Sequence, residues 1–449
     1  MDRKLALDLT RGEIWKVLLA FILPILAGSL IQQLYTTVDA VVVGWFAGRS
    51  GLAAIDSVHT LFKFPLNFMS GLSAGATIMV SRHFGSGDSR KLEDAIRSAF
   101  TIAVILGVVF SLAGALAAPG LLDLMSVPAE IRPVTLVYVR IYFGGLWTMT
   151  LYNMIAGILR AFGNSKSPFY ILLVCCAVNV AGDLLLVGVL HAGVAGAAAA
   201  TVASQLISAV LALRSLKKTF PQEGLLRFSS DGKKIGRMLS IGLPLGLQGI
   251  FFPIANSIIQ ASINKMGTDV IAAWAVCGKL DLLIWLVADA MSPALSTYTS
   301  QNVGAGQTGR VVRGALTGVA FSAGAVAVIS LFLFLFPGQL GSLFATGADR
   351  EVLLPMIIHF MRMMAPFYVF YAVAEAFSGT CCGTGDTVRP MIVTLLCTCG
   401  LRVAAIFLIL PRFGTMDCIV WIYIASWIVT AAAFTAMFAC KVRALRRSA

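Results

Sequence analysis

The sequence predicts an all-α integral membrane protein with twelve transmembrane helices in two pseudo-symmetric six-helix lobes. Three observations predict this fold class: the composition, a series of apolar runs of about twenty residues, and a repeat of the first half in the second. Of the 449 residues, 58% are apolar and 12% are charged, against roughly half and a quarter in soluble domains. A soluble globular protein is therefore excluded.

The apolar runs define the spans. Each run can cross a hydrocarbon layer of about 30 Å at about 1.5 Å per residue. One large soluble core is not an alternative, because single cores stop growing at about 250 to 300 residues. We predict spans at residues 15–40, 53–80, 93–118, 132–160, 168–190, 193–215, 237–263, 270–299, 312–337, 352–380, 388–411 and 416–440. Residues 1–216 then form the N-lobe, 217–235 a cytoplasmic linker and 236–449 the C-lobe.

The formal net charge of +13 raises the question of a nucleic-acid partner, and the placement of the charges answers it. The connections on one side of the predicted spans carry 24 Lys and Arg residues, and those on the other side carry five: Arg49, Arg132, Lys265, Arg350 and Arg412. This alternation follows the positive-inside rule. It predicts an even number of spans, both termini in the cytoplasm and a multi-pass protein of the cell (inner) membrane that binds no nucleic acid.

A duplication relates the two halves. When the chain is shifted against itself by about 220 residues, four short segments align in the same order. These pairs are Ile22–Ile25 with Gly242–Leu245, Ser81–Asp88 with Ser300–Gln307, Arg140 with Arg362, and Gly163–Pro168 with Gly385–Pro390. Because matched segments fall on the same predicted membrane side, the repeats are parallel and related by an axis along the membrane normal.

Small residues and prolines within the spans predict local geometry. The cluster Gly71–Ala76 would let two helices approach closely. Proline inside a helix removes a backbone donor and produces a kink. Pro24, which is repeated as Pro244, is a candidate hinge, and a fixed structural kink is the alternative.

Four polar residues of the first half are candidates for a cation-binding or protonation site. They come from the first, fifth and sixth predicted spans: Asp39, Asn179, Asp183 and Thr201. A charge at the centre of the bilayer costs roughly 2.5 to 3.5 kcal/mol, so two carboxylates in separate spans require an explanation. Carboxylate, amide and hydroxyl oxygens suit Na⁺, or they can share a proton. The alternative is a hydrogen-bonded cluster that only joins the helices.

Other polar residues are candidates for a substrate cavity. Gln32, Tyr35 and Thr36 lie on the same helix face as Asp39, and Met69 could contribute an adaptable apolar wall, with packing as the alternative. In the second half, Ile259 stands where Asp39 stands in the first, and Ala405 stands where Asp183 stands. The charges there are Lys279, Asp281, Asp289, Glu375 and Arg402, of which Asp289 and Glu375 are further substrate-contact candidates. The acidic site is therefore predicted to be asymmetric.

The chain resembles the multidrug and toxic compound extrusion (MATE) family, DinF-like branch. The resemblance rests on Pro24, the face from Gln32 to Asp39, the pair Asn179-x-x-x-Asp183, and the glycine loop Gly85-x-Gly87 repeated at Gln301–Gly306. It implies a two-lobe antiporter that exports organic, often cationic, compounds in exchange for H⁺ or Na⁺. It also implies that the cation site is formed by Asp39, Asn179, Asp183 and Thr201, which would be the ligands if the ion is Na⁺.

Two other functions remain as alternatives. One is a flippase for polysaccharides or lipid-linked oligosaccharides, which would favour a more basic cavity. The other is a membrane-embedded transferase, which would need a nucleophile or metal cluster. The chain has neither a Walker sequence for ATP nor an H-E-x-x-H zinc motif. We therefore expect a monomeric transporter, not an enzyme, that uses no cofactor and acts on small organic molecules in the lipid bilayer.

Overall fold

The computed structural model describes residues 7–46, 48–222, 224–345 and 350–447. In these ranges the chain is almost entirely helical and contains no strand. It divides into two compact units. The described part of unit 1 is residues 7–9 and 20–246, and that of unit 2 is residues 10–19 and 247–447, with the same gaps. The division lies within a helix, at Gly246, and not in the predicted linker.

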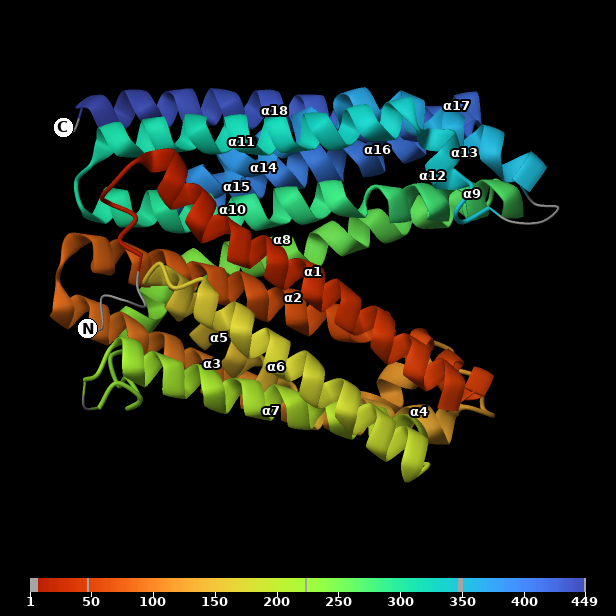
Figure 1. Cartoon of the computed structure of the whole chain (residues 1–449), viewed down its shortest axis with the longest axis horizontal. Coiled ribbons are helices and arrows are strands. Elements are labelled where there is room, and N and C mark those ends of the chain that lie inside the picture. The colour runs from red at the N-terminus through yellow and green to blue at the C-terminus, as the bar shows by residue number, and fades with distance from the viewer. Residues whose placement is uncertain (1–6, 47, 223, 346–349, 448–449) are drawn as a thin grey trace. The chain divides into compact units, whose positions relative to one another are not determined.

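Unit 1 contains seven complete or nearly complete helices and the start of an eighth among its described residues. They are α1 (Ile14–Phe46, from residue 20), α2 (Gly48–Ser86), α3 (Ser89–Leu124), α4 (Arg132–Gly144), α5 (Leu146–Ala161), α6 (Lys166–Asp183) with the π-helical turn η1 (Leu184–Val189), α7 (Gly193–Thr219) and the start of α8 (Gly232–Ile263). Helix α5 contacts α2, α3 and α7, and α6 lies against α7 (Figure 1). Helices α4 and α5 break at Gly145 but together form one span.

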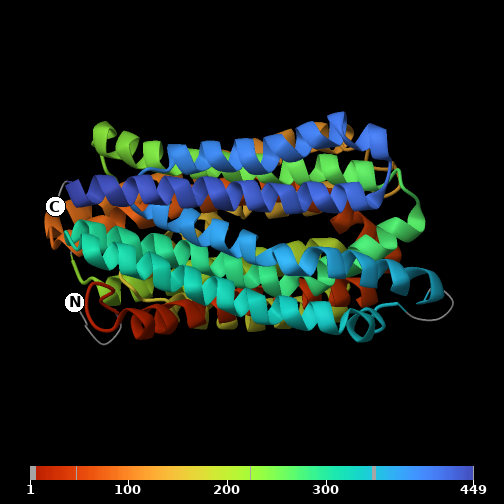
Figure 2. The same ribbon diagram turned by 90° about the horizontal axis from the view of Figure 1, so that it is seen from above.

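Unit 2 is built around α14. Its elements are the end of α8, α9 (Thr268–Leu280), α10 (Leu282–Gly304), α11 (Thr308–Leu335), α12 (Pro337–Gly341), α13 (Arg350–Met364), η3 (Ala365–Phe367), α14 (Tyr368–Gly383), α15 (Val388–Val393), η4 (Thr394–Gly400), α16 (Leu401–Leu408), α17 (Leu410–Phe413) and α18 (Met416–Arg447). Helix α14 packs against α10, α11 and α18. Figure 2 shows α18, in dark blue, as one long unbroken helix. Helices α9 and α10 bend by 48° at Asp281.

The predicted fold class is confirmed as a helical membrane protein. Ten helices of the described chain are long and apolar enough to cross a membrane, or eleven if the bent pair α9 and α10 forms one span. One predicted span is missing from this count: residues 53–80 fall within α2, which is 39 residues long but is not among those ten. Its Ser, Thr, Asn and Lys residues make it less apolar than the other spans.

The repeat is visible in the backbone of the two units. Gly87 and Gly306 both adopt positive φ angles, of 71° and 70°. Gly163 and Gly385 do the same at 77° and 91°. Glycine is favoured in this left-handed region because it lacks a Cβ atom. Both glycine pairs belong to segments that align in the sequence, so the aligned segments form turns of the same kind in each unit.

Close packing of glycines joins α2 to the first part of α8 within unit 1. A Cβ atom at Gly71 would lie 2.3 Å from the backbone nitrogen of Gly246, and one at Gly75 would lie 2.4 Å from Cα of Gly242. Real Cβ atoms are not found at such distances from backbone. The structure therefore confirms that the small residues of Gly71–Ala76 allow two helices to approach closely.

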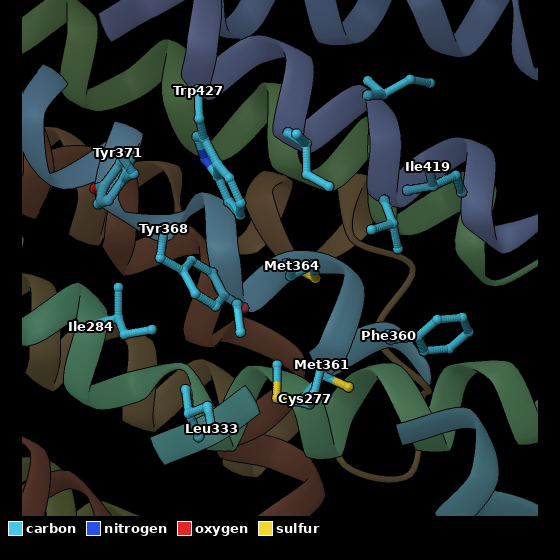
Figure 3. Packing of buried hydrophobic residues seen from close by; sticks show 14 of the residues in the cluster. Cys277, Ile284, Leu333, Phe360, Met361, Met364, Tyr368, Tyr371, Ile419 and Trp427 are labelled. Atoms are coloured by element: carbon cyan, nitrogen blue, oxygen red, sulfur yellow. The ribbon is translucent and has the colours of Figure 1, made fainter. Parts of the chain in front are cut away.

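The largest buried cluster lies in unit 2 and is rich in aromatic and sulfur-containing side chains (Figure 3). Trp427 of α18 and Tyr368 of α14 are almost fully buried, with ring centroids 5.2 Å apart. In Figure 3, Met361, Met364 and Cys277 lie on the side of Tyr368 that faces away from Trp427. This core surrounds the start of α14, the helix that carries Tyr371 and Glu375.

Candidate functional site

Unit 1 brings together the four residues predicted to bind a cation. Asp39 comes from α1, Asn179 and Asp183 from one face of α6, and Thr201 from the third turn of α7. Asn179 and Asp183 are fully buried, and Asp39 is partly exposed. Asn179 Nδ2 donates to Thr201 Oγ1 over 3.4 Å. The carboxyl groups of Asp39 and Asp183 lie close enough to each other for their charges to interact.

The oxygens of this cluster lack hydrogen-bond donors. Both carboxylate oxygens of Asp183, Oδ1 of Asp39 and Oδ1 of Asn179 are buried and receive no hydrogen bond from the described residues. Ionised carboxylates only accept hydrogen bonds. The contact between Asp39 and Asp183 can therefore be a hydrogen bond only when one of them carries a proton. Buried acceptors of this kind are rare in native proteins, and an ion is one of their recognised causes.

A cavity of about 300 Å³ lies beside this cluster within unit 1. Gln32, Tyr35 and Thr36, the predicted polar face of α1, line it, and so does Thr201. Pro24 lines it further along α1. Asp39, Asn179 and Asp183 are not among its lining residues, so Thr201 is the member of the cluster that reaches the cavity. Its size falls at the lower end of small-molecule pockets, which are about 300 to 1,000 Å³.

Met69 is 2% exposed and is not among the residues that line this cavity. A different residue, Arg160 at the end of α5, does line it. The sequence places Arg160 among the basic residues of a predicted cytoplasmic connection, and nothing in the sequence distinguishes it from them. Its position in the cavity depends on how the helices of unit 1 pack around the end of α5.

The two acidic cavity candidates of unit 2 lie close to one tyrosine. The hydroxyl of Tyr371 donates to Asp289 Oδ1 over 3.5 Å. Asp289 is exposed and Glu375, one turn beyond Tyr371 on α14, is partly exposed. Glu375 is close enough to Asp289 for the two charges to interact. The sequence indicates both acids but not Tyr371, which is 82 residues from Asp289 along the chain.

The other three charged residues that the sequence singles out in the second half, Lys279, Asp281 and Arg402, contact aromatic or neutral partners. Asp281 accepts a hydrogen bond from Tyr368 at the bend between α9 and α10. Lys279 Nζ lies 5.3 Å from the ring centroid of Phe344. Arg402 is 2% exposed and donates to Ser426 and Asn256. No ion pair involving these three residues occurs in the part of the chain that the structure describes.

The MatE family model matches residues 24–185 and again residues 244–408. The chain belongs to the MATE family. The two matches start 220 residues apart, and this confirms the duplication predicted from the sequence. As a MATE protein the chain is a multi-pass membrane transporter for small molecules.

Several relatives match this MATE protein over most of their length. It is 25% identical over 433 residues to the probable multidrug resistance protein YoeA of Bacillus subtilis, covering 94% of this chain and 92% of that protein. It is 25% identical over 351 residues to an FAD transporter of Shewanella oneidensis, covering 77% of each. A crystal structure of MATE in complex with MaL6 has a TM-score of 0.90 at 20% identity and covers 98% of this chain and 99% of the other.

One sequence pattern of this MATE protein fits a hydrolase motif without forming its site. Residues Gly71–Gly75 match G-x-S-x-G, in which the serine of a hydrolase sits on a sharp turn after a strand. Here Ser73 lies inside α2 and is 4% exposed, and its hydroxyl donates to the backbone oxygen of Asn153 over 2.8 Å. In the described ranges, no group of three or more His, Cys, Asp or Glu residues could hold a metal ion. The glycines of the pattern serve the helix contact described above.

Proposed function

We propose that this MATE protein is a secondary active antiporter that exports organic compounds, including cationic ones, in exchange for H⁺ or Na⁺. It acts as a monomer in the inner membrane with both termini in the cytoplasm, and it requires no cofactor. The observation that carries the proposal is the buried group of oxygens at Asp39, Asn179 and Asp183 without donors. A cation or protons would supply the positive charge that these oxygens lack.

Charge repulsion gives the site a way to drive a conformational change. Two like charges about 4 Å apart repel by about 4 kcal/mol at an effective dielectric constant of about 20. That energy corresponds to about a thousandfold change in an equilibrium constant. Neutralising Asp39 or Asp183 would remove the repulsion and let α1 approach α6. The ion would therefore favour one of two arrangements of α1, as a ligand with different affinities for two states must.

Helix α1 connects this site to the cavity. It carries Asp39 near one end and Pro24, Gln32, Tyr35 and Thr36 along the cavity wall. Proline removes one helical hydrogen bond, so Pro24 is a suitable hinge. Similar structures are described as bent and straight conformations of MATE, which supports a change in helix shape. A bend of α1 that follows cation binding would reshape the cavity and weaken its hold on substrate, and this reciprocal coupling produces exchange.

The proposal is tested by dye efflux from proteoliposomes. The wild type should expel a cationic dye when either a pH gradient or a Na⁺ gradient is imposed separately. Asp39→Asn and Asp183→Asn should each reduce gradient-driven efflux by at least about tenfold, since loss of one buried charged-group interaction costs about 1.5 to 3 kcal/mol. Asp123→Asn is a matched control, because Asp123 pairs with Arg132 at an exposed helix end. Unchanged efflux in both site variants would refute the proposal.

A further inference from the structure

The cavity of unit 1 carries a positive charge on its wall, and this favours substrates that have an acidic group. Among its described lining residues, Arg160 is the charged one, and no Asp or Glu is included. Asp39 and Asp183 do not line it, whereas Tyr35, which interacts with Asp39, and Thr201 do. A purely cationic molecule in this cavity would meet the guanidinium before it met a carboxylate.

Arg160 has no anionic partner within the described chain. Its guanidinium forms no ion pair and no hydrogen bond there, and the interaction it has is with Tyr152, which also lines the cavity. The side chain is partly exposed, whereas most of α5 around it is buried. A guanidinium offers five N–H donors in a planar fork that matches a carboxylate or phosphate. These donors are available to a molecule in the cavity.

A purely structural role accounts less well for this arrangement. A basic residue in the last turn of a helix interacts favourably with the helix dipole, by about 0.3 to 1 kcal/mol. That role does not require the side chain to enter a cavity, and an exposed arginine would serve it. A second role, capping the turn after α5, is already filled, because Gly163 and Asn164 donate their backbone N–H groups to the carbonyls of Arg160 and Leu159. The guanidinium takes no part in that turn.

We propose that Arg160 binds the acidic group of an amphoteric organic substrate, and that it selects molecules with a free carboxylate over their uncharged esters. The carboxylate lies at the end of the cavity formed by Arg160 and Ser165. The amine or aromatic part extends toward Gln32, Tyr35 and Thr36, on the side of the acidic pair. This inference rests on the proposed function, since it names the substrate class that the same cavity would take.

The polar groups around Arg160 fit this orientation. Asn153, Ser165 and Gln205 also line the cavity, and each offers a neutral hydrogen-bonding group. Tyr35 and Thr201 also line the cavity, and they contact Asp39 and Asn179 of the acidic cluster. A molecule with a negative group at one end and a positive group at the other is therefore electrostatically matched to both ends.

The test compares two dyes that differ at one group. A rhodamine with a free carboxylate is a zwitterion, and the methyl ester of the same dye is a monocation. Binding of each dye to the full-length protein in proteoliposomes is followed by fluorescence anisotropy, and export of each is driven by an ion gradient. The wild type should bind the free acid more tightly than the ester. Arg160→Gln should reduce this preference by about 10- to 100-fold, the range expected for a hydrogen bond to a charged group, by weakening binding of the free acid and not of the ester.

Controls separate this inference from folding and from the proposed function. Arg160→Lys should retain part of the preference, because lysine keeps the charge but loses the planar fork. Arg214→Gln, at an exposed arginine of α7 that does not line the cavity, should leave the preference intact. If neither dye is exported but the preference depends on Arg160, the proposed function fails and this inference stands. If export is ion-driven but Arg160→Gln affects acid and ester equally, this inference fails alone.

A lipid headgroup phosphate is another source of the same anionic chemistry. Vesicles made only of phosphatidylcholine are therefore compared with vesicles that contain phosphatidylglycerol. A preference that persists in both supports binding of the substrate carboxylate. A preference that disappears when phosphatidylglycerol is present would assign Arg160 to a lipid headgroup and overturn the proposal. Failure of the wild type to bind either dye would count against it as well.

Discussion

Arg402 shows how a single residue distinguishes the two units. Its Nε donates to Ser426 Oγ over 2.7 Å, its Nη1 donates to Asn256 Oδ1 over 3.4 Å, and the ring of Tyr423 lies 4.3 Å away. These partners come from α8 and α18. In the alignment that places Leu401 over Asn179, they correspond to residues of α1 and α7, the helices that contribute Asp39 and Thr201. A tethered guanidinium therefore occupies the region of unit 2 where unit 1 has its acidic pair.

Removing this guanidinium should destabilise the protein in a way that a free cation reverses. Arg402→Ala leaves the acceptor Oδ1 of Asn256 without its donor, which costs about 1 to 3 kcal/mol. We expect a lower midpoint of thermal unfolding in detergent, partly restored by millimolar guanidinium but not by Na⁺. Arg362→Ala, at an exposed position of α13, is the control and should change little. A midpoint that is equal to that of the wild type would show that Arg402 is not the residue that satisfies this site.

The sequence predicts the acidic residues within the spans of both units. It does not predict the tyrosines that contact Asp281 and Asp289 in unit 2. Asp39, Asn179, Asp183 and Thr201 are recognisable because polar residues inside apolar spans are costly. The tyrosines that contact Asp281 and Asp289 are 87 and 82 residues distant, and tyrosine is common in spans. The sequence places Arg160 at the last residue of a predicted span beside a cytoplasmic connection, where the positive-inside rule already accounts for a basic residue. Only the packing of the helices shows that Arg160 lines a cavity.

At the scale of elements, the contact between α2 and α8 depends on glycine. We predict that Gly75→Ala strongly impairs folding, because its Cβ would lie 2.4 Å from the Cα atom of Gly242, and backbone cannot move aside as a flexible side chain can. Overpacking of this kind costs about 1 to 3 kcal/mol and sometimes more. The yield of monodisperse protein and its unfolding midpoint provide the measurement.

Gly120→Ala is the matched control for that prediction. Gly120 lies in α3, and a Cβ atom added there would have no neighbouring atom within 4 Å, so alanine fits without a clash. Replacing a helical glycine with alanine stabilises by about 0.4 to 1 kcal/mol, chiefly by restricting the unfolded chain. Equal effects of the two substitutions would contradict the role assigned to the α2 and α8 contact.

The helices themselves follow from hydropathy, but their interruptions do not. Hydropathy predicts residues 132–160 as one helix, whereas the structure divides this span at Gly145, where a Cβ atom would lie 2.2 Å from Val202 of α7. The span 270–299 likewise bends at Asp281, where Tyr368 of α14 supplies a hydrogen bond. Each interruption depends on a residue from another helix. A pattern along one segment contains no information about that neighbour.

At the scale of the whole molecule, the repeat gives both units the same turns, and sequence differences between the halves give the units different polar residues. Both units contain paired glycine turns, but unit 1 holds the carboxylates without donors and unit 2 holds acids with tyrosine partners. The matching turns were predictable because glycine and proline spacing survives in both halves. The division of roles was predictable only in part, from Ile259 and Ala405.

The number of spans makes one further prediction for the whole molecule. The distribution of Lys and Arg requires an even number of spans, whereas ten helices of the described chain, or eleven with the bent pair, are long and apolar enough to cross a membrane. Counting α2 and the bent pair gives twelve, and it places the turn at Gly87 on the cytoplasmic side together with both termini. We expect green fluorescent protein, which fluoresces only when it folds in the cytoplasm, to fluoresce when fused to either end.

A cysteine at Ser86 in a variant otherwise free of cysteine tests α2 directly, because Ser86 ends that helix. It should react with a membrane-impermeant maleimide only in inverted vesicles. If α2 did not cross the membrane while the other eleven spans did, the two termini would lie on opposite sides and only one fusion would fluoresce. If both fusions fluoresce and the cysteine is labelled only in inverted vesicles, α2 must span the membrane in spite of its polar residues. It can do so because it packs closely against the glycines of α8.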